Sequence, residues 1–354
     1  MSEASDISMN GDEKGAFSRR RFLKAGLTSV TGVTLASAAA LFLNDQTTAA
    51  ISDKGIGGLA HTHGKTHPFS LGVTQDNAQG EMDPMKFLTA FDYGKVSTLP
   101  DGTTLREYEL SAIDRLIQVA HGVYYPAWTY NGQVPGPTLR ATEGDRLRIH
   151  FRNNGSHAHT IHFHGFHPAN MDGVFEHVEP DGVYTYEFTA EPFGLHPYHC
   201  HVMPVKKHIE KGLYGTLIID PDPPRPPAKE LVMVMNGFDV NFDGTNEFYT
   251  VNGFANYFME HPIKLKVNEL VRVYLVNMTE FDLINSIHVH ATFFKLYRTG
   301  TRLDDYEYTD TVILGQGERA ILEFSYKSPG RFMFHAHQSE FQELGWNGMF
   351  EVEP

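Results

Sequence analysis

Cysteine is almost absent from this 354-residue sequence: Cys200 is the only one, so no disulfide can form within the chain. Positive charge is also scarce, because 29 basic residues face 43 acidic ones and leave a net charge of −14. Such a surface repels phosphate groups, which argues against nucleic acid as a partner. With 41% hydrophobic and 20% charged residues, the composition excludes a disordered chain and a polytopic membrane protein.

The first 50 residues have the pattern of an export signal. Three consecutive arginines, Arg19 to Arg21, precede a stretch of small and apolar residues over 25–43, and Ala49 and Ala50 provide a cleavage region. This arrangement resembles a twin-arginine signal peptide. A retained membrane anchor is the alternative, since about 20 apolar residues can span a bilayer. We expect residues 1–50 to be removed, leaving a periplasmic or extracellular mature chain without a transmembrane span.

The rest of the chain has the pattern of an all-β protein in two domains. From about residue 105, short runs rich in Val, Ile, Tyr, Phe and Leu alternate with turn clusters such as Asn131-Gly132, which is typical of antiparallel β-sandwiches. Five of the seven residues over 221–227 are proline, so no sheet continues through them. We therefore expect an N-terminal extension over 51–104, a domain over 105–222, a linker over 223–228 and a second domain over 229–354.

The two domains look like copies of one another, and each contains two His-x-His pairs. Asn131-Gly132 and the run 146–153 recur as Asn252-Gly253 and the run 271–277. The pairs follow in the same order in both halves: His162/His164 and His199/His201, then His288/His290 and His335/His337. Four pairs in a repeated order are hard to obtain by chance, and they indicate metal binding.

The alternation of side chains along a strand predicts which of these residues share a site. His199 and His201 point to one face and Cys200 to the other, while His159 points away from its neighbours His162 and His164 and can meet the cysteine. His208, eight residues after Cys200, is a third ligand. One Cys and two His with a weak axial ligand select copper for electron transfer, whereas zinc prefers a fourth strong ligand.

The axial position and the remaining histidines leave alternatives open. Leu213 stands where a thioether is expected, and Met203 is another axial candidate or a packing residue. The eight paired histidines suit copper but are too many for one ion. If three ions share them, two take three each and one takes two, which leaves positions open for a small molecule.

With these motifs the sequence resembles the two-domain multicopper oxidases, a small laccase-like group, over roughly residues 105–354. The resemblance implies two cupredoxin-like Greek-key β-sandwich domains and four copper ions per chain. It places type 1 copper on His159, Cys200 and His208, with Leu213 at the axial position, and assigns His162 and His288 to type 2 copper. It assigns to the type 3 pair His164, His199, His201, His290, His335 and His337.

The second half departs from the first where the type 1 ligands should recur, because it has Asn285, Ala336 and Phe341 there. We therefore expect one type 1 site per chain. The resemblance further implies a homotrimer in which the trinuclear cluster forms between the first domain of one chain and the second domain of its neighbour. Asp172 resembles the family's proton-relay acid, and Glu340 is a second candidate.

The function that the resemblance implies is one-electron oxidation of a reducing substrate coupled to four-electron reduction of O2 to water. The donor stays open between a phenol or aromatic amine, a metal ion and a small nitrogen compound. A copper nitrite reductase is an alternative, although its catalytic copper needs only three histidines and it lacks a His such as His201 directly after the cysteine. A noncatalytic blue copper electron carrier would leave eight histidines unexplained.

Two further patterns are set aside. The segment 239–244 resembles the opening of a calcium loop, but the twelfth position is Thr250 rather than Glu, so we expect a β-hairpin turn. His61, His63 and His67 lie in a Gly-rich stretch that we expect to be a flexible tail, with copper capture as the alternative.

Overall fold

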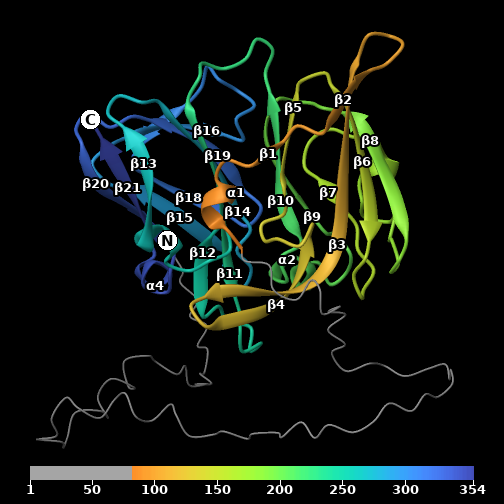
Figure 1. Cartoon of the computed structure of the whole chain (residues 1–354), viewed down its shortest axis with the longest axis horizontal. Coiled ribbons are helices and arrows are strands. Elements are labelled where there is room, and N and C mark those ends of the chain that lie inside the picture. The colour runs from red at the N-terminus through yellow and green to blue at the C-terminus, as the bar shows by residue number, and fades with distance from the viewer. Residues whose placement is uncertain (1–81) are drawn as a thin grey trace, which may run out of the picture. The chain divides into compact units, whose positions relative to one another are not determined.

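The computed structural model describes residues 82–354 (Figure 1). The predicted signal peptide and His61, His63 and His67 lie outside the described residues. The helices of the described part have four to six residues each: α1 (Pro84–Phe87), α2 (Val205–Glu210), α3 (Tyr257–Glu260) and α4 (Ser339–Glu343). None of them is long and apolar enough to cross a membrane. The rest is built from strands, which confirms the all-β prediction.

The first half of the chain forms two sheets. One has the order β1 (Phe91–Asp92), β5 (Thr138–Thr142), β10 (Tyr214–Asp220), β9 (Gly194–His199) and β7 (His162–Phe163). The other has the order β2 (Lys95–Thr98), β3 (Thr104–Ala120), β6 (Arg146–Asn153) and β8 (Val183–Thr189), and β4 (Val123–Tyr130) pairs with β3.

The second half repeats this arrangement. Its first sheet has the order β12 (Phe248–Val251), β11 (Lys229–Phe238), β14 (Val271–Asn277), β19 (Arg319–Phe324), β16 (Phe294–Arg298) and β17 (Glu307–Thr309). Its second has the order β13 (His261–Lys266), β21 (Asn347–Glu353), β20 (Gly330–His335), β15 (Ile284–Val289) and β18 (Thr311–Gly315). Parallel strand pairs recur at equivalent places in the two halves. The pair β3 and β6 corresponds to β11 and β14, and the pair β5 and β10 corresponds to β13 and β21. The sequence repeat is thus a structural repeat.

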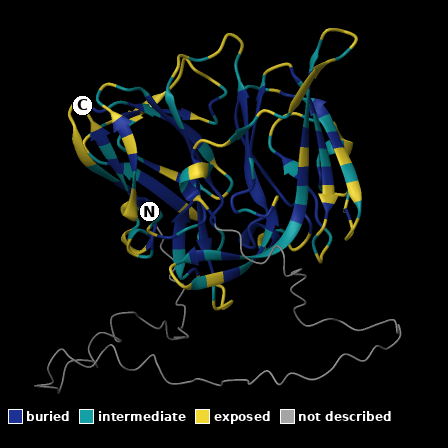
Figure 2. Cartoon of the chain, in the orientation of Figure 1, coloured by how far each residue is buried: buried dark blue, intermediate teal, exposed yellow. Residues whose placement is uncertain are grey.

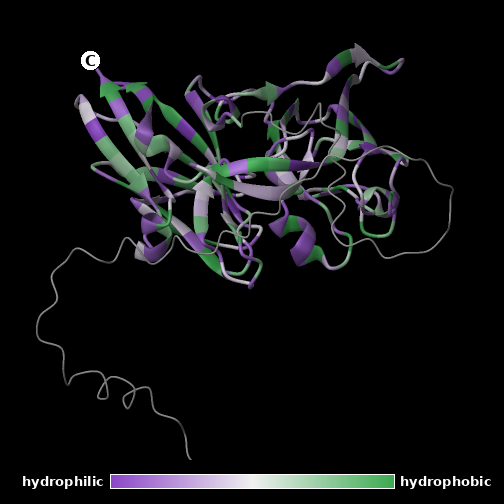
Figure 3. Cartoon of the chain, turned by 60° about the horizontal axis from the view of Figure 1, so that its bottom comes forward, coloured by the Kyte–Doolittle hydropathy of each residue, from purple (hydrophilic) through white to green (hydrophobic). Residues whose placement is uncertain are grey.

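Alternating burial explains why these segments form sandwiches. Along β6, Leu147, Ile149 and Phe151 are buried, while Arg148 and Arg152 are not, so one face packs and the other meets water. Figure 3 shows hydrophobic and hydrophilic residues following one another along the strands. Strands β9 and β10 in the middle of the molecule are buried almost throughout (Figure 2), and they contribute the cysteine region.

The two halves share a buried apolar cluster. Strand β3 has 17 residues: its first part pairs with β6, and its second part continues as a hairpin with β4 that runs below the second half (Figure 1). Ile117 and Tyr125 of this hairpin belong to the same cluster as Val232 and Tyr274 of the second half. The halves therefore pack as one unit.

A network of ion pairs reinforces this contact. Arg140 of β5 lies 2.7 Å from Asp220 and 2.6 Å from Glu230 of the second half, and Arg272 also pairs with Glu230, at 3.1 Å. The Arg140 and Arg272 side chains are 10% and 3% exposed, so the network is shielded from water.

The segment expected to be an extension contributes to the first sandwich. β1 pairs with β5, and β2 pairs with β3, so sheet residues begin at Phe91 rather than at 105. Sequence patterns missed these strands because β1 has only two residues and all four residues of β2 are exposed, which leaves no alternation to detect. The segment after Asp239 joins the antiparallel strands β11 and β12, which agrees with the predicted hairpin.

Candidate metal centres

One candidate centre combines a thiol and two imidazoles. Cys200 directly follows β9, and its Sγ lies 3.1 Å from Nδ1 of His208 and 3.9 Å from Nδ1 of His159. The two Nδ1 atoms are 3.2 Å apart. All three residues are buried. The strand alternation that predicted this meeting of His159 and Cys200 is therefore reproduced by the geometry.

The surroundings of this centre fit a copper ion. Burial lowers the pKa of His159 to about 3 and that of His208 to about 4, so both imidazoles are neutral at pH 7 and offer a lone pair. Burial raises the pKa of the Cys200 thiol. The amide of Thr160 donates a hydrogen bond to Sγ at 3.4 Å, and this bond opposes the rise because it favours the thiolate. A buried sulfur with two neutral imidazoles is a soft donor set, which copper prefers.

The residue predicted for the axial position, Leu213, has an apolar side chain. Leu213 is fully buried in the same apolar cluster as Cys200, and its carbonyl accepts the Cys200 amide at 3.0 Å. Met203 is instead 74% exposed, so the alternative axial candidate faces water. This centre therefore offers three donor atoms.

A first histidine quartet, consisting of His162, His164, His199 and His201, lies on the other face of β9. His162 and His199 are directly paired across β7 and β9, and the Nε2 atoms of His164 and His199 are 3.3 Å apart. The rings of His162 and His201 are 5.4 Å apart between centroids. Nδ1 of His162 lies 2.8 Å from the Asp172 carbonyl, and Nδ1 of His199 lies 3.0 Å from that of Cys200. Such bonds place the proton on Nδ1 and leave Nε2 for a metal.

A second histidine quartet, His288, His290, His335 and His337, repeats this geometry. His288 and His335 are paired across β15 and β20, and the Nε2 atoms of His290 and His335 are 3.0 Å apart. Nδ1 of His288 lies 3.0 Å from the Asp310 carbonyl, and Nδ1 of His335 lies 2.7 Å from that of Ala336. Within residues 82–354 no hydrogen bond or ring contact joins this quartet to the first.

Burial favours the neutral form of several quartet imidazoles. It lowers the pKa of His164 to about 3 and that of His199 to about 4, and it also lowers the pKa values of His290 and His335. Neighbouring imidazoles add to the effect because two positive charges at this distance repel. Neutral Nε2 atoms are the form that metals bind.

Of the two predicted acids, the structure brings Asp172 to the histidines. Its Oδ1 lies 3.1 Å from Nδ1 of His162 and 3.6 Å from Nε2 of His167. Glu340 is exposed in the first turn of α4, and its carboxylate has no hydrogen bond to the described residues.

Two residues near the quartets were missed by sequence reasoning. His167 joins His162 and Asp172, and Asp310 lies beside His288, with its Oδ1 at 3.9 Å from Nδ1. His167 follows a His-x-His pair by three residues, a spacing that could have signalled it. Asp310 lies between β17 and β18, twenty residues after His290, where no pattern points to it.

The equivalent of the thiol centre in the second half is closed by packing. Asn285 donates a hydrogen bond to Thr279 at 2.9 Å, and Ala336 replaces the cysteine. Phe341 stacks on Tyr249 with ring centroids 3.8 Å apart and planes inclined by 14°. This position therefore has no metal-binding atoms like those of the first half.

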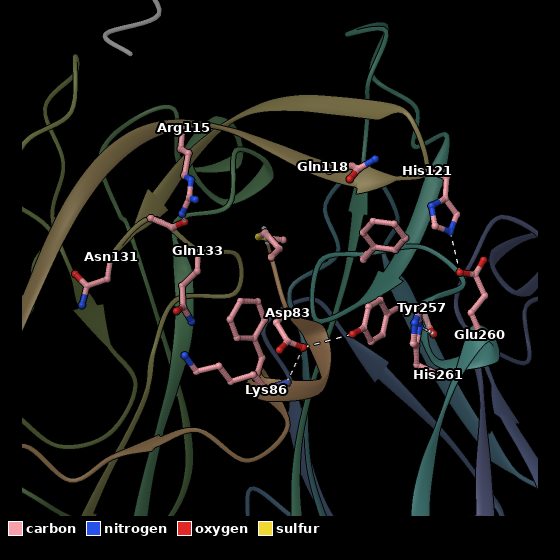
Figure 4. A pocket seen from close by; sticks show the side chains of 14 residues that line it. Asp83, Lys86, Arg115, Gln118, His121, Asn131, Gln133, Tyr257, Glu260 and His261 are labelled. Atoms are coloured by element: carbon pink, nitrogen blue, oxygen red, sulfur yellow. Dashed lines mark hydrogen bonds and ion pairs between the residues drawn. The ribbon is translucent and has the colours of Figure 1, made fainter. Parts of the chain in front are cut away.

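A separate cavity of about 770 Å³ lies between α1, the β3–β4 hairpin and α3 (Figure 4). His121 and Glu260 pair on its wall at 2.8 Å, and Asp83 accepts a hydrogen bond from Tyr257 at 3.4 Å. Neither Cys200 nor any quartet histidine lines it, so it is not part of the metal centres.

Several known proteins with similar sequences or folds are named multicopper oxidases or copper-containing nitrite reductases. Two family models described as multicopper oxidase match residues 115–224 and 224–354. A crystal structure of a multicopper oxidase is 53% identical, with a TM-score of 0.76, and the match covers 79% of this chain and all of that chain. The multicopper oxidase mgLAC is 29% identical, with a TM-score of 0.64, over 70% of this chain and 86% of that one.

The copper-containing nitrite reductase of Neisseria gonorrhoeae is 30% identical over 250 residues, 65% of this chain. The match spans 63% of that relative, so this chain covers less than two thirds of its length. The similar oxidase structures confirm the predicted cupredoxin fold. Since the two family models together match residues 115–354, and the 53% identical oxidase is covered over its whole length, the chain belongs to the multicopper oxidase family.

Proposed function

We propose that this protein is a laccase-like copper oxidase that oxidises a reducing substrate one electron at a time and reduces O2 to water. Type 1 copper would be held by His159, Cys200 and His208, beside Leu213. A trinuclear cluster, giving four coppers per chain in total, would be held by the two histidine quartets. The observation that carries this proposal is the matching pair of quartets, each with two Nδ1 atoms tied to backbone carbonyls.

The cluster would form between subunits of a homotrimer. In one chain the two quartets make no contact within the described residues, although they occupy equivalent places in the two sandwiches. A ring of heterologous contacts between the first half of one subunit and the second half of the next would bring them together. Such an assembly explains why each half carries one histidine quartet.

Bound copper supplies the one-electron chemistry and the O2 reduction. The chain itself connects the two kinds of site, because Cys200 is covalently joined to both His199 and His201. Asp172 holds the ring of His162, and a carboxylate at this place can carry a proton towards the quartet. Glu340 is proposed as a second proton carrier only on its position three residues after His337.

The test is to count copper per chain in the loaded trimer and to record absorption and O2 consumption on the same sample. Four coppers with a blue thiolate band and O2 uptake with a phenol are expected. The matched variant Cys200→Ser should lose the blue band and one copper. Two coppers per chain would contradict the trinuclear cluster, and one would leave a blue copper electron carrier.

Nitrite reduction is the second candidate, supported by the sequence similarity to copper-containing nitrite reductases. That reaction needs three histidines at its catalytic copper, which leaves the additional pairs of this chain without a role. Anaerobic incubation with nitrite and a reduced dye separates the two functions. We expect O2 consumption to exceed nitrite consumption, and the opposite result would favour nitrite reductase.

We also propose that residues 1–50 direct twin-arginine export to the periplasm or the extracellular space, leaving no transmembrane span in the mature chain. The three arginines and the weakly apolar stretch after them support this. Changing Arg19, Arg20 and Arg21 to Lys should leave the full-length precursor in the cytoplasm. Export of that variant would contradict the assignment.

A further inference from the structure

The cavity of about 770 Å³ is built by three separate segments of the chain. The first half contributes the β3–β4 hairpin and the turn after it, the second half contributes α3 and the residues before it, and α1 closes the space between them (Figure 4). The volume is that of a pocket for a small organic molecule, and such pockets commonly lie where two domains meet. A ligand in this cavity would therefore touch both halves of the chain.

One wall of the cavity is made of rings. The Phe254 ring meets those of His121 and Tyr257 edge-on, with centroids 5.3 Å and 5.8 Å away. The Tyr257 ring also stacks on that of His261 at 4.5 Å, with the planes inclined by 23°. His121, Tyr257 and His261 lie together on the right of Figure 4. Because these rings hold one another in place, they offer a prepared surface for another aromatic ring.

The opposite wall carries two positive charges. Lys86 of α1 and Arg115 of β3 line the cavity, and neither forms an ion pair with the part of the chain that the structure describes. The Arg115 guanidinium has five N–H groups, of which one, on Nη1, donates a hydrogen bond to the Gly132 carbonyl. Both side chains lie on the left of Figure 4, with Gln133. This wall therefore has charged donors available for an anion.

The acidic residues of the cavity are already engaged. Glu260 pairs with His121 at 2.8 Å. Asp83 caps α1 by accepting the Lys86 amide at 3.1 Å, and it also accepts the Tyr257 hydroxyl at 3.4 Å. Since the carboxylates have partners and the two cations have no ion pair within residues 82–354, the cavity can accept a negative charge. The whole chain has a net charge of −14, so this recognition depends on the local cations.

From this arrangement we infer that the cavity binds a small organic carboxylate that carries an aromatic ring. The carboxylate faces Lys86 and Arg115, and the ring packs against Phe254 and Tyr257. An inorganic anion would leave the ring wall uncovered, and a neutral aromatic molecule would leave the two cations unpaired. Because the ligand touches both halves, its binding stabilises their contact. The inference goes beyond the proposed oxidase function and does not depend on it, since no predicted copper ligand lines the cavity.

The first experiment is a calorimetric titration of copper-free full-length protein with 3-phenylpropanoate, which has a ring and a carboxylate but no phenolic hydroxyl. We expect saturable binding of one molecule per chain, and no binding would overturn the inference. 3-Phenylpropanamide lacks the charge and acetate lacks the ring, so each should bind at least about tenfold more weakly. Equal affinity for the amide would contradict the role of the cations, and equal affinity for acetate would contradict that of the ring wall.

The second experiment repeats the titration with variants. Lys86→Gln and Arg115→Gln should each weaken the binding of 3-phenylpropanoate about tenfold or more, the usual effect of losing a hydrogen bond to a charged group. Phe254→Leu should weaken it about twofold to tenfold, the range of an aromatic pair. The matched control Lys95→Gln removes an exposed lysine of β2, outside the cavity, and should leave the affinity unchanged.

The variants also separate a local site from a general effect of charge. Equal weakening in Lys95→Gln and Lys86→Gln would contradict the site, because it would indicate long-range attraction only. Unchanged affinity in both Lys86→Gln and Arg115→Gln would place the ligand elsewhere and overturn the inference. Lys86 is exposed, so its variant keeps the test valid even if Arg115→Gln, which loses the bond to Gly132, does not fold.

Discussion

Asp172 is the residue at which the structure ties protonation most directly to the histidine quartets. Its side chain and its backbone carbonyl both face Nδ1 of His162, so Asp172→Asn keeps the carbonyl contact and removes only the charge. We expect O2 consumption to fall about a hundredfold, the usual contribution of a general acid, without loss of blue absorbance. The exposed variant Asp304→Asn serves as control, and an unchanged rate in Asp172→Asn would exclude a proton-transfer role.

Single residues also mark how far sequence reasoning reaches. The grouping of His159 with Cys200 was predictable because β9 is a regular strand whose alternation fixes the faces. The contact of His167 with Asp172 was not, since it depends on a short 3-10 turn over Ala169–Met171 that brings the two side chains together.

At the scale of elements, the connection between β14 and β15 packs against α2, which carries His208. Lys206 of α2 lies over the Phe281 ring at 3.9 Å, and burial raises the pKa of the neighbouring Glu280 to about 7. Lys206 opposes this shift and Glu210 adds to it. Glu280 thus stays protonated in the folded protein at pH values where it ionises in the unfolded chain.

This shift predicts the sign of a pH dependence. Between pH 4.5 and about 7 the folded state holds one more proton at Glu280 than the unfolded state, so this residue lowers the stability as pH rises. We expect Glu280→Gln to remove up to about 2 kcal/mol of that loss between pH 5 and pH 7, measured by urea unfolding of copper-free protein at the two pH values. The control Glu343→Gln changes an exposed residue and should keep the wild-type dependence of stability on pH. The same wild-type dependence in Glu280→Gln would contradict the prediction, because it would mean that the Glu280 carboxyl is ionised in the folded protein.

Most strands were predictable because each half consists of short runs rich in Val, Ile, Tyr, Phe and Leu between turn clusters, and because the same order of runs occurs in both halves. The exceptions have physical reasons. β1 is too short and β2 too exposed to produce a pattern. Both form by pairing with strands of the first sandwich, β1 with β5 and β2 with β3. The contact between the halves depends on the bend of β3 and its hairpin with β4, which no local pattern encodes.

At the scale of the whole molecule, Arg140 is central to the ion pairs that join the halves. Its guanidinium bonds to both Asp220 and Glu230 and is 10% exposed, so Arg140→Ala leaves two shielded carboxylates without this partner. We expect the free energy of unfolding to fall by about 3 to 5 kcal/mol. Arg331→Ala, which breaks the exposed pair with Glu351, should change it by less than about 1 kcal/mol. Equal effects would show that the network does not stabilise the contact.

The trimer proposal predicts complementation between two inactive variants. His164→Ala damages the first quartet and His290→Ala the second, so neither homotrimer can assemble a complete cluster. In randomly mixed trimers, about one quarter of the interfaces pair an intact first quartet with an intact second one. Co-expression should therefore recover about a quarter of the wild-type O2 consumption. No recovery, in trimers shown by mass spectrometry to be mixed, would place each cluster within a single chain.

The single, fully buried Cys200 also makes opening of the first sandwich measurable through its reaction with a thiol reagent. In copper-free protein, a thiol reagent can react only after the first sandwich opens enough to admit it, and the second sandwich contributes no signal because it has no cysteine. The labelling rate under native conditions therefore counts opening events of one half of the molecule, without any engineered probe. The decrease of this labelling rate on copper loading measures how much the bound ion stabilises the first sandwich against opening.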